Sequence, residues 1–301
     1  MPPSQREGMV IINFIISILQ QGLIFGIIAL GVYISYKILD FPDLTVDGSY
    51  ALGASVAAVS IHAGAAPWLA CLLALLCGLI AGIITGLLHV YGKITNLLCG
   101  IITMTALYSI NLVIMGGRAN ISLAGQANLF RGELFGIATN NAVVRLIMIA
   151  VIVVIIKLIL DWFFTTKMGM LIRAVGSNSQ LVTSIGGNNG LYKIIGLSIS
   201  NGLVAFAGSL MAQLQNFADV GMSVGVIVLG LTSVILGITI AKRLKFVSGS
   251  TASVFGAIIY QAVIGTALFL GMPTSYLRLT MALLLVTILL LGGIKRGGTA
   301  K

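Results

Sequence analysis

The sequence predicts an all-helical protein that crosses a membrane several times. Hydrophobic residues make up 58% of the 301 residues and charged residues only 8%, whereas a soluble domain carries about 25% charged residues. The apolar residues form runs of about 20, which is the length of helix that crosses about 30 Å of hydrocarbon. Composition therefore excludes both a soluble globular chain and a disordered one.

About nine such runs follow one another in a single transmembrane domain over residues 1–301. We predict spans at 9–36, 48–64, 67–90, 96–115, 142–164, 194–214, 224–241, 254–270 and 276–291. The first run is longer than one crossing requires and contains Gln20 and Gln21, so we expect it to be tilted or broken. Eight or ten spans remain possible.

The basic residues predict the orientation. Lysine and arginine accumulate in cytoplasmic loops, and most of them, including Lys93, Arg173 and Lys193, fall on the side that also carries the C-terminus. The C-terminus is therefore expected in the cytoplasm, and an odd number of spans puts the N-terminus outside. The net charge of +10 thus indicates membrane orientation and not nucleic-acid binding.

Acidic and sulfur-containing side chains are few. The seven acidic residues are Glu7, Asp40, Asp43, Asp47, Glu133, Asp161 and Asp219. They are too scattered to build a carboxylate cluster, and the three cysteines lie in apolar segments without CxxC spacing. We expect no catalytic residue and no metal site.

Two further patterns concern packing and symmetry. Gly78, Gly82 and Gly86 repeat along one face of the third span, which allows a neighbouring backbone to approach closely. Phe41-Pro42-Asp43 before the second span is echoed by Phe217-Ala218-Asp219 before the seventh. Because these copies are five spans apart, pseudo-repeats over about 9–115 and 194–291 would be inverted in the membrane, as in many transporters.

The acidic stretch ILDFPDLTVDGSY predicts a break between helices, since Pro42 hinders helix continuation. Asp43 or Thr45 can cap the span that follows. Alternatively, the break lies within the membrane, where irregular backbone is tolerated only beside protein or water, and its carboxylates line a path. Both interpretations remain open.

On the predicted inner side, residues 165–189 contain a short amphipathic helix. Ser177 or Asn178 can cap it, Leu181, Val182 and Ile185 form its apolar face, and Gly186 with Gly187 ends it. Such a helix lies on the lipid interface or docks in a groove of a cytoplasmic partner.

Polar residues inside the spans are candidates for a substrate path, although most such residues bond across helices. Together with the acidic residues near span ends, the candidates are Asp43, Thr45, Asp47, Thr103, Thr105, Ser109, Asn111, Ser198, Asn201 and Asp219. In the outer segment 116–141, Phe130, Leu134 and Phe135 predict a short surface helix. It would contact an external binding protein or shield the mouth of the bundle.

The run Arg173-Ala174-Val175-Gly176-Ser177-Asn178, then Ile185-Gly186, then Lys193 and a span that ends in GSLMAQLQ, resembles the cytoplasmic loop of ABC importer permeases of the branched-chain amino acid and ribose permease family. ALGVYISYKILDFPDLTVDGSYALGASVAA is similar to the N-terminal region of the same family, most closely in amino-acid-type permeases paired with a lipoprotein. TMTALYSINLVIMG and QNFADVGMSVG extend the resemblance over nearly the whole chain.

The resemblance implies a type II ABC importer permease with inverted repeats in the bacterial cell membrane, carrying a small nutrient such as an amino acid. Its implied partners are a second permease copy, two cytoplasmic ATPase subunits and an extracytoplasmic substrate-binding lipoprotein. The ATPase-coupling residues would be Arg173, Gly176, Ser177, Asn178, Leu181, Val182, Ile185 and Gly186.

ATP and Mg would bind the partner ATPase. In this chain the nearest phosphate-loop match, Gly92-Lys93-Ile94, lacks the first glycine and the Ser or Thr after lysine. We therefore expect a transport subunit that is not an enzyme. The alternative is an ion-coupled secondary transporter, which usually needs an ionisable residue deep in a span.

Overall fold

The computed structural model describes residues 3–130, 133–134, 137–138, 141–241 and 248–293. The long helices are α1 (Pro3–Val32), α2 (Thr45–His62), α3 (Pro67–Val90), α4 (Asn96–Ile114), α5 (Ala142–Phe163), α8 (Asn189–Gln215), α9 (Val226–Ala241), α10 (Gly249–Phe269) and α11 (Leu277–Gly293). Shorter elements are η1 (Tyr33–Ile38), β1 (Asn120–Ser122), β2 (Glu133–Leu134), β3 (Ile137–Ala138), α6 (Lys167–Ser177), α7 (Ser179–Ser184), β4 (Phe217–Asp219), η2 (Val220–Ser223) and η3 (Thr274–Tyr276). The predicted helical membrane architecture is confirmed.

Seven stretches of the described chain are long and apolar enough to cross a membrane. They are Ile11–Ile38, Pro67–Val90, Asn96–Ile114, Ala142–Phe163, Asn189–Gln215, Val220–Ala241 and Gly249–Phe269. Each of the nine predicted spans falls on a long helix, but α2 and α11 are not among the seven. The coarse prediction of a multi-pass protein therefore holds, and the count of nine is not confirmed.

The first helix does not break at its glutamines. Gln20 Nε2 donates to the carbonyl oxygen of Ala142 at 2.8 Å, and Gln21 Oε1 accepts from Gln261 Nε2 at 2.9 Å. Neighbouring helices thus satisfy both amides, so α1 continues past them and widens into the π-helix η1 only at Tyr33. The prediction of a break at the glutamines is therefore wrong. The chain leaves helical structure only after Ile38.

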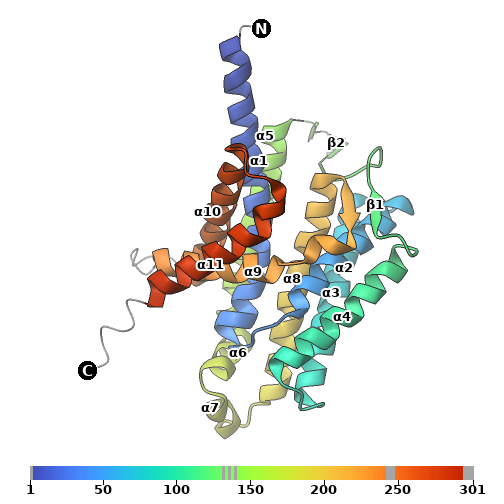
Figure 1. Cartoon of the computed structure of the whole chain (residues 1–301). Coiled ribbons are helices and arrows are strands. Elements are labelled where there is room, and N and C mark those ends of the chain that lie inside the picture. Colours follow the sequence, from blue (N-terminus) through green and yellow to red (C-terminus); the bar gives the residue numbers. More distant parts are fainter. Residues whose placement is uncertain (1–2, 131–132, 135–136, 139–140, 242–247, 294–301) are drawn as a thin grey trace.

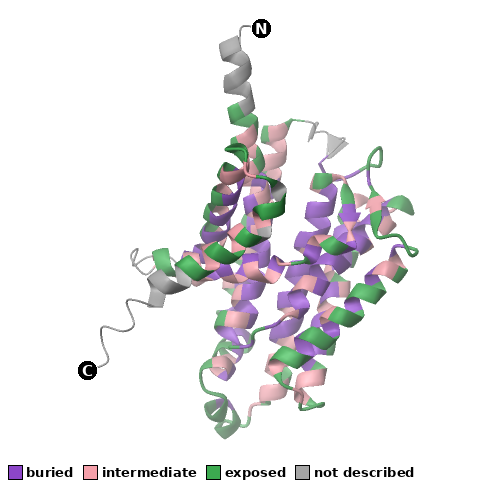
Figure 2. Ribbon diagram, viewed as in Figure 1, coloured by how far each residue is buried: buried purple, intermediate pink, exposed green. Residues whose placement is uncertain are grey.

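α8 and α1 form the centre of the bundle. α8 packs against α2, α3 and α1, while α1 packs against α10, α5 and α9 (Figure 1). Buried residues concentrate where these helices meet (Figure 2). A Cβ on Gly78 would lie 2.5 Å from Ala205 Cβ, and one on Gly86 would lie 2.8 Å from Ile194 Cα. The predicted close packing along this glycine face is confirmed.

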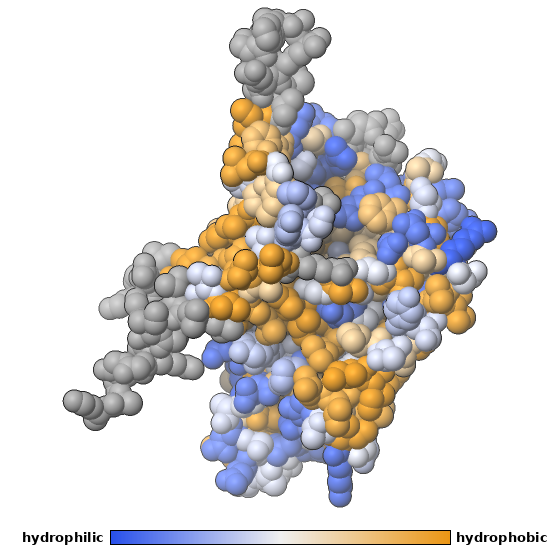
Figure 3. Space-filling view, in the orientation of Figure 1, coloured by the Kyte–Doolittle hydropathy of each residue, from blue (hydrophilic) through white to orange (hydrophobic). Residues whose placement is uncertain are grey.

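Apolar side chains also cover much of the outside. Leu97, Leu98, Ile101 and Ile102 of α4 are exposed, and hydrophobic residues gather around the lower part of that helix in Figure 3. Exposed apolar surface on this scale is expected of a helix that faces lipid or another membrane chain.

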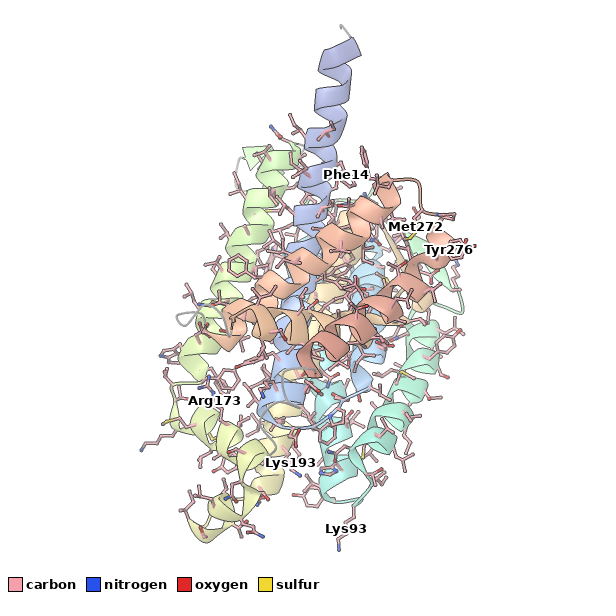
Figure 4. All side chains as sticks on the ribbon, turned by 60° about the vertical axis from the view of Figure 1, so that its left-hand side comes forward. Phe14, Lys93, Arg173, Lys193, Met272 and Tyr276 are labelled. Carbon is pink, nitrogen blue, oxygen red and sulfur yellow. The ribbon has the colours of Figure 1, made fainter. Side chains whose placement is uncertain are left out.

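A group of basic residues marks one end of the molecule, which we call the basic end. Lys93, Arg173 and Lys193 lie at one end, opposite Phe14, Met272 and Tyr276 (Figure 4). The three basic residues lie on the side that the sequence predicts to face the cytoplasm, and that orientation stays a prediction. The basic residues of 242–247 and the C-terminal residues 294–301 fall outside the described ranges.

In the outer segment, the part that the structure describes between residues 116 and 130 contains a strand and turns in place of the predicted helix. β1 pairs antiparallel with β4, with Ile121 opposite Ala218. Phe130 is buried in the core, so its side chain is not on the surface where a binding protein could contact it. The side chain of Leu134 and the whole of Phe135 lie outside the described residues.

Candidate functional site

A cleft of about 350 Å³ opens between α2, α4 and the η2 turn. Its lining residues are Asp47, Gly48, Ala51, Met104, Thr105, Tyr108, Ser109, Asn111, Val220, Ser223 and Val224. It thus brings together four of the residues that the sequence nominated for a substrate path, namely Asp47, Thr105, Ser109 and Asn111.

The α4 side of the cleft follows from helical periodicity. Thr105 and Ser109 are four residues apart, as are Met104 and Tyr108, so each pair shares a face of the helix. Tyr108 was not among the predicted path residues, which are small polar or acidic side chains. Its spacing from Thr105 and Asn111, three residues in each direction, was the available signal.

Asp47 connects the α2 side of the cleft to α9. Its Oδ1 accepts from the backbone nitrogen of Ile227 at 2.7 Å, and its Oδ2 accepts from that of Gly225 at 3.2 Å. Gly225 has a φ of +94°, a conformation that favours glycine. The carboxylate therefore binds N–H groups at the beginning of α9, where helices leave donors unpaired.

Three other polar residues of the cleft already donate a hydrogen bond within the chain. Thr105 Oγ1 donates to Ile101 O at 2.8 Å, and Ser223 Oγ donates to Val220 O at 3.4 Å. Asn111 Nδ2 donates to Gly48 O at 3.3 Å, while its Oδ1 has no hydrogen-bond partner within the described residues.

Asp43 lies inside the bundle and does not line the cleft. Its Oδ1 accepts from the backbone nitrogen of Thr45 at 2.9 Å, so it satisfies the first N–H of α2, and its Oδ2 accepts from Asn201 Nδ2 at 2.7 Å. Thr45 Oγ1 lies 2.9 Å from Thr85 Oγ1. Asp43 thus links the break at residues 39–44 to α8, and Thr45 links the start of α2 to α3. Asp43 binds the first N–H of α2, although the N-cap position itself is Leu44.

Three more nominated residues are also outside the cleft. Thr103 is buried and its hydroxyl has no partner among the described residues. Ser198 donates to Leu79 O at 3.0 Å. Asp219 lies in β4 and accepts from Gly221 N and from Asn120 Nδ2. Of the nominated path residues, one set therefore lines the cleft and a second set joins elements to one another, while Thr103 does neither.

At the basic end, α6 and α7 form the predicted amphipathic segment. Asn178 Oδ1 accepts from Leu181 N at 3.2 Å, so Asn178 is the N-cap of α7. Gly186, with a φ of +76°, follows its end. Leu181 and Ile185 are 52% and 64% exposed, whereas Val182 is fully buried.

The place of Val182 corrects the predicted apolar face. Its Cγ1 would lie 2.6 Å from a Cβ on Gly187, so the chain folds back over this side chain after α7. A surface partner can therefore reach Leu181 and Ile185 but not Val182.

α6 also touches the break in the first helix. A Cβ on Gly176 would overlap the carbonyl oxygen of Ile38 and lie 2.9 Å from Leu39 Cα. Beside this contact is a hollow of about 480 Å³ that includes Lys37, Asp40 and Arg173. The guanidinium of Arg173 lies over the Phe164 ring, 4.9 Å from its centroid.

His89 has partners that the sequence did not reveal. Its Nδ1 lies 2.9 Å from Ile94 O, and its Nε2 lies 3.1 Å from Lys193 Nζ. The ring also meets Phe41 edge-on, with centroids 5.1 Å apart. The contacts with Lys193 and Phe41 join elements far apart in the chain, so no local pattern predicts them. Within the described residues, no three His, Cys, Asp or Glu side chains gather as a metal site would require.

Comparisons with known proteins give a family match over most of the chain. The family described as "Branched-chain amino acid transport system / permease component" matches residues 14–291. A "Tyrosine transport system permease protein" of Clostridioides difficile (strain R20291) is 48% identical over 280 residues, 93% of this chain and 92% of that protein. "Uncharacterized protein RP368" of Rickettsia prowazekii (strain Madrid E) is 36% identical over 277 residues, 91% of this chain and 95% of that protein.

A solved structure, "PsaBC from Streptococcus pneumoniae in complex with Fab", is 15% identical and covers 83% of this chain and 89% of that chain, with a TM-score of 0.34. At that score the likeness supports no argument about this chain.

Proposed function

This chain belongs to the family of permease components of branched-chain amino acid transport systems, and we propose that it forms the membrane path for an amino acid in an ATP-driven importer. As a member of that family it is a multi-pass transport subunit and not an enzyme. The tyrosine transport permease that is 48% identical to it makes an aromatic amino acid the first cargo to test.

The observation that carries the proposal is the exposed apolar pair on α7. Leu181 and Ile185 project from a capped helix at the basic end of the molecule, and neither packs into the bundle. A short helix with an exposed apolar face fits a groove on a partner. In the proposed importer this groove belongs to a cytoplasmic ATPase, which binds the ATP and Mg.

The complete assembly that we propose has two copies of this chain, two such ATPases and an extracytoplasmic lipoprotein that delivers the cargo. The C-terminus lies in the cytoplasm. Each state of the path is favoured by differential binding, ATP stabilising one packing of the bundle and hydrolysis the other.

The proposed movement passes from α7 to the cleft through the break. α6 contacts Ile38 and Leu39 at Gly176. The same segment leads to Asp43, which bonds α8 through Asn201, and then to Asp47, which bonds the beginning of α9. A shift of α6 would therefore reach the elements that border the cleft.

The test is uptake of L-tyrosine into vesicles that contain the full chain, its ATPase partner and the binding lipoprotein. We expect uptake that depends on ATP and falls at least tenfold with Leu181→Asp or Ile185→Asp, because a carboxylate cannot be buried in an apolar groove without a large cost. Gln180→Asp, on the same helix but outside the apolar pair, is the matched control.

Uptake by the chain alone along a proton or sodium gradient would contradict the proposal and favour a secondary transporter. So would unchanged ATP-driven uptake in both α7 variants.

A further inference from the structure

We propose that the cleft between α2, α4 and η2 recognises its cargo by a primary ammonium group, with Asp47 as the charged receptor. This inference rests on the proposed function and adds to it the chemical group of the cargo that the permease itself binds.

The first argument is the balance of donors and acceptors in the cleft. The hydroxyl protons of Thr105 and Ser223 are already donated to backbone carbonyls, so the two oxygens have only acceptor capacity left. Asn111 turns its amide nitrogen to Gly48 O, which leaves its Oδ1 as a buried acceptor without a partner in the described chain. The cleft therefore offers acceptors to a ligand that brings donors, and the hydroxyls of Tyr108 and Ser109, which also line it, can accept as well as donate.

The second argument is charge. The Asp47 carboxylate accepts from two neutral backbone N–H groups, and no basic side chain is among the described residues that line the cleft. The ion pair of the described chain, Lys157–Asp161, belongs to α5. A carboxylate in a largely apolar membrane cleft is stabilised most by a cation that enters it.

A primary ammonium matches both conditions. It carries one positive charge and three N–H donors and has no acceptor. Asp47 and Asn111 both line the cleft, and Asn111 bonds the carbonyl of Gly48, the residue after Asp47. Tyr108 is exposed on the same side and supplies aromatic surface for the remainder of the cargo. The competing explanation is that Asp47 does no more than bind the beginning of α9.

The test uses the full chain with its ATPase partner in lipid nanodiscs without the binding lipoprotein. Equilibrium binding is measured for three probes: L-tyrosine, tyramine, which keeps the ammonium, and 3-(4-hydroxyphenyl)propionate, which keeps only the carboxylate. We expect the two ammonium compounds to bind at least tenfold more tightly than the propionate, which corresponds to about 1.4 kcal/mol. In Asp47→Asn this preference is expected to disappear.

Asp40→Asn is the matched control, because it removes the same charge from an exposed carboxylate that does not line the cleft. Thr105→Val removes one acceptor from an exposed position and is expected to weaken tyramine binding severalfold. This variant and the wild-type probe series decide the matter if Asp47→Asn does not fold, as judged by thermal unfolding.

Equal binding of the three probes, or an unchanged preference in Asp47→Asn, would overturn the inference. Either result would leave ATP-driven uptake intact, so it is distinguishable from failure of the proposed function. Absence of ATP-driven uptake by the wild-type assembly would instead contradict the proposed function.

Discussion

Asp43 is a buried carboxylate that fixes the break between η1 and α2. It is 1% exposed and accepts from the backbone of Thr45 and from Asn201. The sequence predicted a cap from Asp43 near the break. It did not predict that Asp43 faces α8 while Asp47 faces the cleft, because that difference depends on how α2 is rotated against its neighbours.

We expect Asp43→Ala to lower the free energy of unfolding by about 2 kcal/mol, because Thr45 N and Asn201 Nδ2 lose a buried acceptor. Chemical denaturation of the purified chain in detergent measures this. Asp40→Asn is the control, since Asp40 is exposed and its φ of +53° is one that asparagine tolerates. Equal stability of the two variants would contradict the bonding role of Asp43.

At Val182, the prediction of an exposed apolar side chain was wrong. α7 has only six residues, too few turns for periodicity to define one apolar face. Which side chain is buried depends on the chain folding back at Gly187, a tertiary contact that the local pattern does not contain. The cap at Asn178 could be predicted because it is local.

Among the elements, the break at residues 39–44 lies between α6 and α2. Gly176 of α6 packs against Ile38 and Leu39 at its beginning, and α2 follows its end. Pro42 and the acidic residues predicted a break there, and the π-helix before it is a form that occurs often at functional sites. The contact with α6 could not be predicted, because more than a hundred residues separate Ile38 from Gly176.

Gly176→Ala is expected to leave the assembly intact and to reduce uptake per ATP hydrolysed at least fivefold. The added methyl group overlaps Ile38 O, so α6 has to move away from the break. Uptake and phosphate release measured on the same vesicles give the ratio. Met170→Ala, at an exposed position of α6 outside the predicted coupling residues, is the control, and an unchanged ratio in Gly176→Ala would exclude this contact from coupling.

We also propose that the elements form two inverted repeats, as the echo of Phe41-Pro42-Asp43 in Phe217-Ala218-Asp219 predicts. Asp43 accepts from the backbone two residues on, and so does Asp219. A Cβ on Gly53 of α2 would meet α8, and a Cβ on Gly230 of α9 would meet α1. The pairing of α2 with α8 thus has a counterpart in the pairing of α9 with α1.

For the whole molecule, hydropathy was sufficient to place the long helices, because a helix that crosses a membrane must be apolar along most of its length. Hydropathy does not determine the ends or the exact number of spans, since α2 carries many small and polar residues and is largely buried by other helices. The cleft was predictable only in part, because it forms where three separate elements meet.

The central claim is that a separate ATPase binds this chain at α7. The direct measurement is co-purification of the ATPase with the tagged full chain in detergent, compared between wild type, Leu181→Asp, Ile185→Asp and Gln180→Asp. We predict that the ATPase is retained by wild type and Gln180→Asp and lost from the two apolar-face variants. Equal retention in all four, or no retention by wild type, would contradict the claim.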